Sequence, residues 1–437
     1  MAKATLRWVP RLGAVAVGVA LLAGVAAAGA DDPKPKADAK VDPALREELL
    51  KLNQKTGEES QRAALLKLVK DKAKAKTAVA AALKIAKAEK DSKPFNYNAC
   101  LILARAAHFV HDYDAGEFFY EQCIEQATKV SSGSKIIQAY DGLVDLYWDA
   151  KRFQAVIDTC ERFLDLDSPE EVKEVRGMFL ERQIQAMARA GQTDQALAMT
   201  DRLIKLNPAS WYALQLKGYV LREAGKTDAA IEAYTQAIGK LDTDKKVEKE
   251  VKDRFKDRLR YILSGLYVDA KNIDKAAEEL QALIKRNPEN PTYKNDLGFI
   301  WADNDKNLEE SEKLVREALE LDKKRQQKAV DDGLIDEVKE NAAYLDSMGW
   351  VLFKQKKYKE ALKYLEQAVA DEEEGNHLEI WDHLADCYLA MGQTKKAVQT
   401  WEKGLKLEDL GPRDKERRRA VVAKLQKARE DLKGDGE

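Results

Sequence analysis

The chain has 437 residues, of which 45% are hydrophobic and 34% are charged, with a formal net charge of −2. This near-neutral balance excludes a protein whose affinity depends on a strongly basic surface, so we expect no nucleic-acid partner. No segment alternates apolar and polar residues over a sustained length, which excludes a substantial β-sheet and favours an all-α fold.

The N-terminus has the three parts of a secretory signal peptide. Lys3, Arg7 and Arg11 come before an apolar stretch over residues 12–29, and Ala28-Gly29-Ala30 has the small-x-small form of a cleavage site. Residues 1–30 are therefore predicted to direct export to the periplasm or cell envelope. The alternative is an uncleaved membrane anchor, although so much Ala and Gly makes the stretch marginal for a membrane span.

A flexible linker and a helical cap are predicted to follow. Residues 31–43 contain Pro33 and Pro35 among Lys, Asp and Ala, a composition typical of linkers. Residues 44–92 contain helical leucines with Gly57 as a break, which indicates an irregular N-terminal helical cap. This cap is rich in lysine, and its lysines either form a solvated helix face or contact an acidic surface such as a membrane.

An internal repeat occupies most of the remaining chain. Gly191 and Gly225 are 34 residues apart, and so are Ala196 and Ala230. A helix hairpin needs small residues where its two helices touch and large apolar residues where it meets the next hairpin. Two segments show this pattern clearly, and their packing residues are Leu214, Gly218, Leu221, Gly225, Ala230, Tyr234 and Ala237 in the first, and Trp381, Leu384, Ala385, Tyr388, Gly392, Ala397, Trp401 and Gly404 in the second.

This pattern resembles the tetratricopeptide repeat (TPR), whose period is also 34 residues. The string from Tyr344 to Trp350 is similar to tandem repeats of bacterial envelope proteins. The resemblance implies a right-handed superhelical solenoid of helix-turn-helix units. About eight units are expected over residues 97–411, beginning near Tyr97, Ile137, Gly177, Trp211, Asp257, Pro291, Ala342 and Leu378.

Two polar insertions and a terminal helix complete the predicted organisation. Residues 243–256 are almost wholly charged and are expected to extend the following helix, and residues 323–341 separate two repeats. Residues 412–437 are expected to form a C-terminal capping helix and tail, because Val421, Leu425 and Ala428 have helical spacing.

Catalytic and metal chemistry has little support in this sequence. The chain has only four histidines, and it lacks a recognisable nucleophile elbow or a Gly-rich phosphate loop. His108, His111, Asp112 and Asp114 come closest to a metal cluster, but Asp112 is better explained as a residue that begins a helix. We therefore expect no enzyme activity, no metal and no cofactor.

The expected function is an exported scaffold that binds a protein or peptide partner and assembles or retains a complex at the envelope. Repeats fill nearly the whole chain and leave no room for a catalytic domain. The alternatives are a structural protein that docks on the membrane or cell wall through its basic terminal helices and, with less support, an enzyme accessory. The sequence names no partner and no oligomeric state.

The resemblance also places the binding groove on the first helix of each hairpin. On this frame the solvent-facing positions of the first helices carry aromatic and acidic residues, which would anchor a ligand and select basic groups on it. The candidate groove residues are Trp148, Tyr212, Tyr219, Tyr261, Phe299, Trp350, Phe353, Asp141, Asp145, Asp149, Asp346, Asp382 and Asp386. Alternatively, several of these rings pack against the neighbouring first helix and meet no ligand.

Cys100 and Cys123 form a candidate disulfide. Export permits disulfides, and the four cysteines of the chain are an even number. Cys100 lies early in the first helix of its hairpin and Cys123 lies late in the second, so antiparallel packing brings them to the same end. The alternative is that both are reduced core residues, which is the usual state of cysteine at buried positions.

Overall fold

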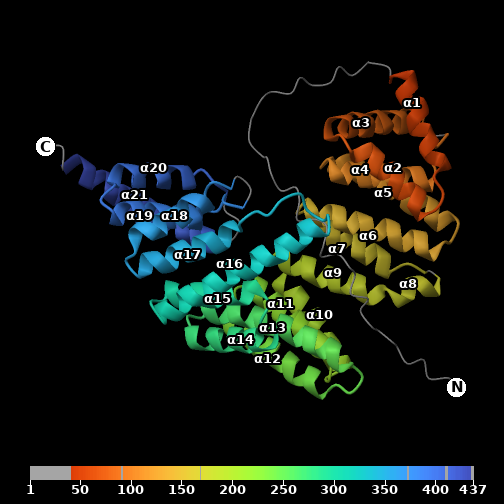
Figure 1. Ribbon diagram of the computed structural model, residues 1–437. Helices are drawn as coiled ribbons and strands as arrows, with labels where there is room; N and C mark the ends of the chain where they lie inside the picture. Colours follow the sequence, from red (N-terminus) through yellow and green to blue (C-terminus); the bar gives the residue numbers. More distant parts are fainter. Residues whose placement is uncertain (1–40, 90–91, 168, 372–373, 409–411, 435–437) are drawn as a thin grey trace. The chain divides into compact units, whose positions relative to one another are not determined.

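The computed structural model describes residues 41–89, 92–167, 169–371, 374–408 and 412–434 (Figure 1). Over these residues the secondary structure is helical throughout, with no β-strand. None of the described helices is both long and apolar enough to cross a membrane. The signal peptide and most of the linker predicted from the sequence lie outside the described residues.

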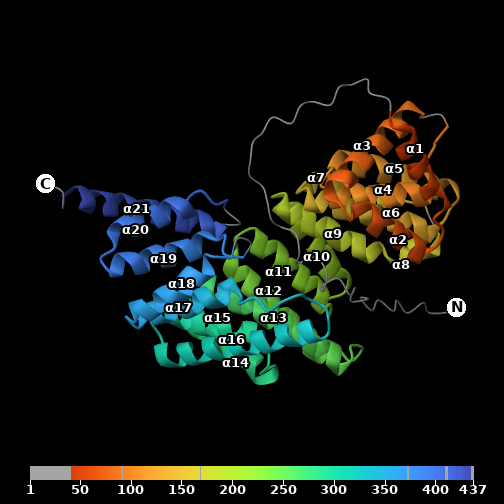
Figure 2. The same ribbon diagram turned by 45° about the horizontal axis from the view of Figure 1, so that its top comes forward.

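The contacts divide the chain into two units. The N-terminal unit comprises the described residues up to Ala270, and the C-terminal unit comprises those from Lys271 onward. Both units consist of antiparallel helix hairpins that follow one another along the chain, as Figures 1 and 2 show.

The N-terminal unit begins with an irregular cap and continues with regular hairpins. The cap consists of α1 (Pro43–Leu50), the 3-10 helix η1 (Lys51–Gln54), α2 (Glu58–Val69) and α3 (Lys72–Ala88). The elements that follow are α4 (Tyr97–Phe109), α5 (Tyr113–Lys129), α6 (Gly133–Asp149), α7 (Phe153–Leu164), the short α8 (Glu170–Glu174), α9 (Arg176–Arg189), α10 (Thr193–Leu206), α11 (Trp211–Glu223), α12 (Thr227–Thr243) and α13 (Lys249–Asp269).

The C-terminal unit has three hairpins between two single helices. It contains α14 (Ile273–Arg286), α15 (Pro291–Asp303), α16 (Leu308–Asp331), α17 (Ala342–Lys354), α18 (Tyr358–Ala368), α19 (Leu378–Ala390), α20 (Thr394–Gly404) and α21 (Pro412–Gly434). The two insertions lengthen helices instead of forming separate elements, because α13 begins at Lys249 and α16 continues to Asp331.

In several hairpins the close contact between the two helices depends on a glycine in the first helix. A Cβ atom on Gly349 of α17 would lie 2.5 Å from Cγ of Leu365 in α18, and one on Gly218 of α11 would lie 3.0 Å from the ring of Tyr234 in α12. Each glycine thus gives a large side chain of the second helix room against the first helix.

The hairpin turns use the left-handed backbone region even without glycine. Gly225 has a φ of +68°, and its turn is closed by hydrogen bonds from its N–H to Arg222 O (3.0 Å) and from Lys226 N–H to Leu221 O (2.9 Å). Lys356 has a φ of +64° and makes the equivalent turn, with a bond from its N–H to Phe353 O of 2.8 Å. A lysine in this region is strained by roughly 1–2 kcal/mol, so hairpin packing rather than local preference determines this turn.

Substitution at Ala230 tests the packing within a hairpin. Ala230 of α12 is fully buried, whereas its neighbour Ala229 is exposed. We expect Ala230→Leu to lower the free energy of unfolding by about 1–3 kcal/mol, because the larger side chain overpacks the contact. Urea denaturation followed by circular dichroism measures this loss. Ala229→Leu is the matched control, and equal stability of the two variants would contradict the assigned packing.

Candidate functional site

First helices of successive hairpins contact one another in both units. In the C-terminal unit α15 contacts α17, α17 contacts α19, and α19 contacts α21. In the N-terminal unit α4 contacts α6 and α9 contacts α11. The surface of the first helices, the first-helix face, carries the candidate residues of the predicted groove.

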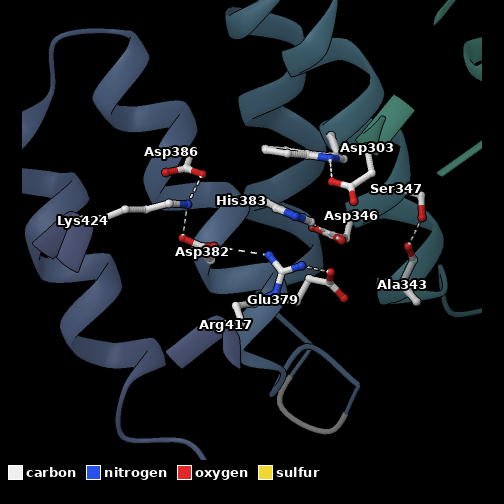
Figure 3. Close-up of polar contacts among 11 residues, drawn as sticks. Asp303, Ala343, Asp346, Ser347, Glu379, Asp382, His383, Asp386, Arg417 and Lys424 are labelled. Carbon is white, nitrogen blue, oxygen red and sulfur yellow. Dashed lines mark hydrogen bonds and ion pairs between the residues drawn. The ribbon is translucent and has the colours of Figure 1, made fainter. Parts of the chain in front are cut away.

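A group of interacting polar side chains lies on the first-helix face of the C-terminal unit (Figure 3). On α19, Glu379, Asp382, His383 and Asp386 are spaced so that they lie on the same side of the helix. Helices α15, α17 and α21 add the side chains that meet them. We call this group of residues from α15, α17, α19 and α21 the C-terminal polar cluster.

His383 is the most deeply buried member of the cluster. Its Nδ1 lies 2.9 and 3.1 Å from the two carboxylate oxygens of Asp346, so this nitrogen carries a proton and donates it. Burial alone would lower the pKa of His383, but the Asp346 carboxylate outweighs it and the pKa is raised. The buried Nε2 has no hydrogen-bond partner among the described residues.

The Trp350 ring packs against the face of the His383 ring. The two rings stack at a centroid distance of 4.0 Å, and Phe353 stacks on Trp350 at 4.8 Å. Trp350 Nε1 donates a hydrogen bond of 3.1 Å to Asp303 at the end of α15. This stack and its two carboxylates join α15, α17 and α19 into one block.

The terminal helix α21 supplies the cations that meet the carboxylates of α19. Lys424 Nζ lies 2.9 Å from Asp382 Oδ1 and 2.6 Å from Asp386 Oδ2. Arg417 pairs with both Asp382 (3.3 Å) and Glu379, and Trp401 Nε1 donates to Asp382 over 2.9 Å. Burial raises the pKa of Asp386, and the nearby Asp382 charge raises it further. Without α21 these carboxylates would lose both of their described cationic partners.

In the C-terminal unit three of the candidate groove residues are therefore not available to a ligand, and the packing alternative for the rings applies there. Trp350, Asp346 and Asp382 are buried, although their helix positions predicted exposure. Asp386 is bound to Lys424, and Phe299 and Phe353 are half-buried beside the His383–Trp350 stack. The cause is the lateral contact between first helices, together with α21, which covers the face of α19.

The aspartates of the N-terminal unit are also engaged within the protein. Arg182 of α9 pairs with Asp145 and lies 3.5 Å from Asp141, both on α6. Burial raises the pKa of Asp141, and the charge of Asp145 adds to this rise. His108 Nε2 lies 2.7 Å from Asp149 Oδ2. These carboxylates stabilise contacts between hairpins and are not unpaired charges that await a ligand.

Of the candidate aromatic residues of the N-terminal unit, one is exposed and three are half-buried. Trp148 is half-buried with its ring edge-to-face against Phe153, and Tyr212 is half-buried beside Trp211. Tyr219 is half-buried under Arg222, whose guanidinium lies 5.1 Å from the ring. Tyr261 of α13 is exposed to 39%. These four rings on α6, α11 and α13 keep part of their surface accessible, and Tyr261 is the most exposed of them.

All four cysteines are free and buried. Cys100 and Cys123 lie next to each other as antiparallel packing predicts, and each thiol faces a backbone carbonyl, of Phe95 and Tyr97 respectively. Burial raises the pKa of Cys123 well above its ordinary value, and contact with the Cys100 thiol raises it further. The structure thus has both residues as free thiols inside the hairpin, which is the alternative to the candidate disulfide.

The residues missed by sequence reasoning belong to the C-terminal polar cluster. Arg417 and Lys424 are seven residues apart on α21, a spacing that puts both on the face opposite α19. This spacing indicates that Arg417 and Lys424 share one face of the helix. It does not indicate that they are buried, because basic residues on a terminal helix are usually solvated. Among the described residues no group of His, Cys, Asp and Glu side chains has the arrangement of a metal site.

Comparison with known families identifies the repeat. Models of the tetratricopeptide repeat match residues 182–245, 266–326 and 352–425. A TPR repeat-containing protein of Pseudomonas aeruginosa is 26% identical over 205 residues, which are 45% of this chain and 29% of that protein. The chain thus matches less than a third of the length of this relative.

Solved structures with weak similarity are also repeat proteins. A tetratricopeptide repeat protein from Parabacteroides merdae has 14% sequence identity and a TM-score of 0.42, covering 69% of this chain and 98% of its own. A thermophilic TPR protein of Thermus thermophilus has 18% identity and a TM-score of 0.34, covering 49% and 99%. Structural similarity this weak does not indicate which molecule the protein binds.

The pH dependence of stability tests the His383–Asp346 contact. Because folding raises the pKa of His383, its contribution to stability is fully present below the ordinary histidine pKa of about 6.5 and is lost as the pH rises through the folded-state value. We expect the unfolding free energy of wild type to fall on this rise, measured by urea denaturation at a series of pH values.

The variant His383→Gln, which does not titrate, should lack this loss. The matched control is His377→Gln, because His377 is exposed just before α19. A pH profile of His383→Gln that equals the wild-type profile would contradict this assignment.

Proposed function

Because this chain contains tetratricopeptide repeats in both of its units, we propose that it is an exported scaffold that binds a protein or peptide partner. In this proposal the first-helix face of the N-terminal unit holds the partner, and the protein assembles or retains a complex at the cell envelope. Its role is binding without catalysis.

The observation that carries this proposal is the set of accessible rings on α6, α11 and α13. Trp148, Tyr212, Tyr219 and Tyr261 lie on first helices and keep part of their surface in contact with solvent. Aromatic side chains dominate the affinity of protein interfaces because they bury a large area with few rotatable bonds. The C-terminal unit, in contrast, uses its rings and carboxylates to hold its own helices together.

The acidic residues are not expected to select a basic ligand by charge. Asp145 and Asp149 are each within 4 Å of a cationic or titratable partner of the same unit, Arg182 and His108. The charge of Asp145 is therefore compensated by Arg182 before any partner binds, and the Asp149 carboxylate is already hydrogen-bonded to His108. Apolar and aromatic contacts should provide most of the affinity, and added salt should change the association rate little.

Affinity capture from envelope extracts tests the binding surface. We expect Trp148→Ala and Tyr261→Ala each to weaken capture by more than about 1 kcal/mol, measured by quantitative mass spectrometry of the recovered partner. Leu206→Ala is the matched control, because Leu206 is an exposed apolar residue at the end of a second helix. Capture that is unchanged in both aromatic variants, with the fold intact by circular dichroism, would remove this face as the binding surface.

Export is supported by the form of the N-terminus. The basic residues, the apolar stretch and Ala28-Gly29-Ala30 follow the order that secretion signals require. We expect N-terminal sequencing of the mature protein to begin at or near Asp31. Full-length chain recovered from the cytosol would overturn this part of the proposal.

A second candidate function is docking on an anionic membrane or cell-wall surface. Helix α3 favours it, because its five lysines are all exposed and the helix contains no acidic residue: Lys72, Lys74, Lys76, Lys84 and Lys87. The basic C-terminal helix supports it less, since Arg417 and Lys424 pair within the protein. Binding to anionic vesicles that falls when these five lysines are replaced by glutamine would favour docking over the scaffold role.

A further inference from the structure

The cap of the N-terminal unit contains an apolar hollow of about 860 Å³. It is lined by one side of α1 and η1, including Leu49 and Leu52, by Ala64 and Leu68 of α2, and by Ala78 of α3. Its walls are aliphatic, and lysine side chains stand around it. Its size falls within the range of about 300–1,000 Å³ that is common for small-molecule sites.

The hollow exists because α2 is covered on one side only. Helix α2 packs against α3 and α4, whereas α1 packs against α3 and η1 packs against α4. As a result α2 has no fully buried side chain, although it carries four large apolar residues. Leu65 and Leu68 are half-buried, and Leu66 is exposed to 58%. An apolar ligand between α1 and α2 would cover surface that the protein itself leaves open.

The charges around the hollow leave one cation unmatched. Three lysines on its rim are each paired with an acidic neighbour: Lys51 with Glu47 at 2.8 Å, Lys67 with Glu48 at 3.0 Å and Lys74 with Asp71 at 3.8 Å. Lys55, at the end of η1, also lines the hollow and is half-buried, but it makes no ion pair in the described part of the chain. A lysine ammonium without a counter-charge attracts an anion that reaches it.

We propose that this hollow binds one long-chain fatty acid, with its acyl chain between α1 and α2 and its carboxylate at Lys55. A single carboxylate matches the single unpaired lysine. An acidic helix of a partner protein would bring several carboxylates to a rim whose other lysines are already paired. The aliphatic walls suit an acyl chain, which has no polar groups to satisfy along its length.

Calorimetric titration of the full chain with decanoate, dodecanoate and tetradecanoate below their micellar concentrations tests this site. We expect one bound molecule per chain, with affinity that rises about threefold to fourfold for each added methylene. No binding of any of the three acids, or an affinity independent of chain length, would overturn the proposal.

Two pairs of variants locate the ligand. Lys55→Met should weaken dodecanoate binding at least tenfold and leave binding of uncharged 1-dodecanol unchanged. Lys70→Met, at an exposed lysine outside the hollow, should change the binding of neither ligand. Ala64→Phe should fill the hollow and prevent binding of both ligands. Its control is Ala80→Phe on the exposed side of α3, and circular dichroism verifies that all four variants are folded.

A labelling experiment distinguishes the occupants. Since the native cysteines are buried, the thiol introduced by Ala64→Cys should be the one that reacts with maleimide, and dodecanoate should slow its labelling at least tenfold. Protection by vesicles of phosphatidylglycerol but not by dodecanoate would assign the surface to a membrane and overturn the proposal. Protection by a captured protein but not by dodecanoate would assign it to a partner helix, which would overturn it equally.

Discussion

The close contact between the two helices of each hairpin is the constraint on which this structure depends. Gly349 faces Leu365, and Gly218 faces Tyr234, at distances that leave no space for a Cβ atom. This contact orients both helices, so it also determines which side of the first helix faces its neighbours. The conformation of the turn follows from the contact, since Lys356 adopts a left-handed backbone where another repeat uses glycine.

Once the first helices lie side by side, carboxylates on them need partners from other helices. Asp346 has His383 of α19, Asp382 has Trp401 and two cations from outside its helix, and Asp145 has Arg182. Apart from the Asp382–Trp401 bond within one hairpin, these pairings join helices that are not consecutive in the sequence. A buried carboxylate that loses such a partner is costly, because its charge is then neither hydrated nor compensated. The acidic residues are therefore part of what holds successive hairpins together.

The two units therefore differ in which part of their first-helix face remains accessible. In the C-terminal unit the first-helix face is closed by the His383–Trp350 stack and by α21. In the N-terminal unit four rings remain accessible on the same kind of face, and the cap leaves α2 partly uncovered. Residues that pack within the repeats are not available to a ligand. Binding of a partner would therefore use the residues that remain accessible.

The sequence by itself determined the repeat and the order of its helices. The 34-residue interval and the alternation of small and large residues predict the hairpins, and α4, α11, α15, α17 and α19 begin at Tyr97, Trp211, Pro291, Ala342 and Leu378. These features are local, because they depend on spacing along one or two helices. Only the tertiary structure decided that Trp350 and Asp382 are buried, that the cysteines are free and that α21 meets α19. Helical periodicity shows which side of a helix a residue occupies, but exposure depends on the neighbouring helix that covers that side.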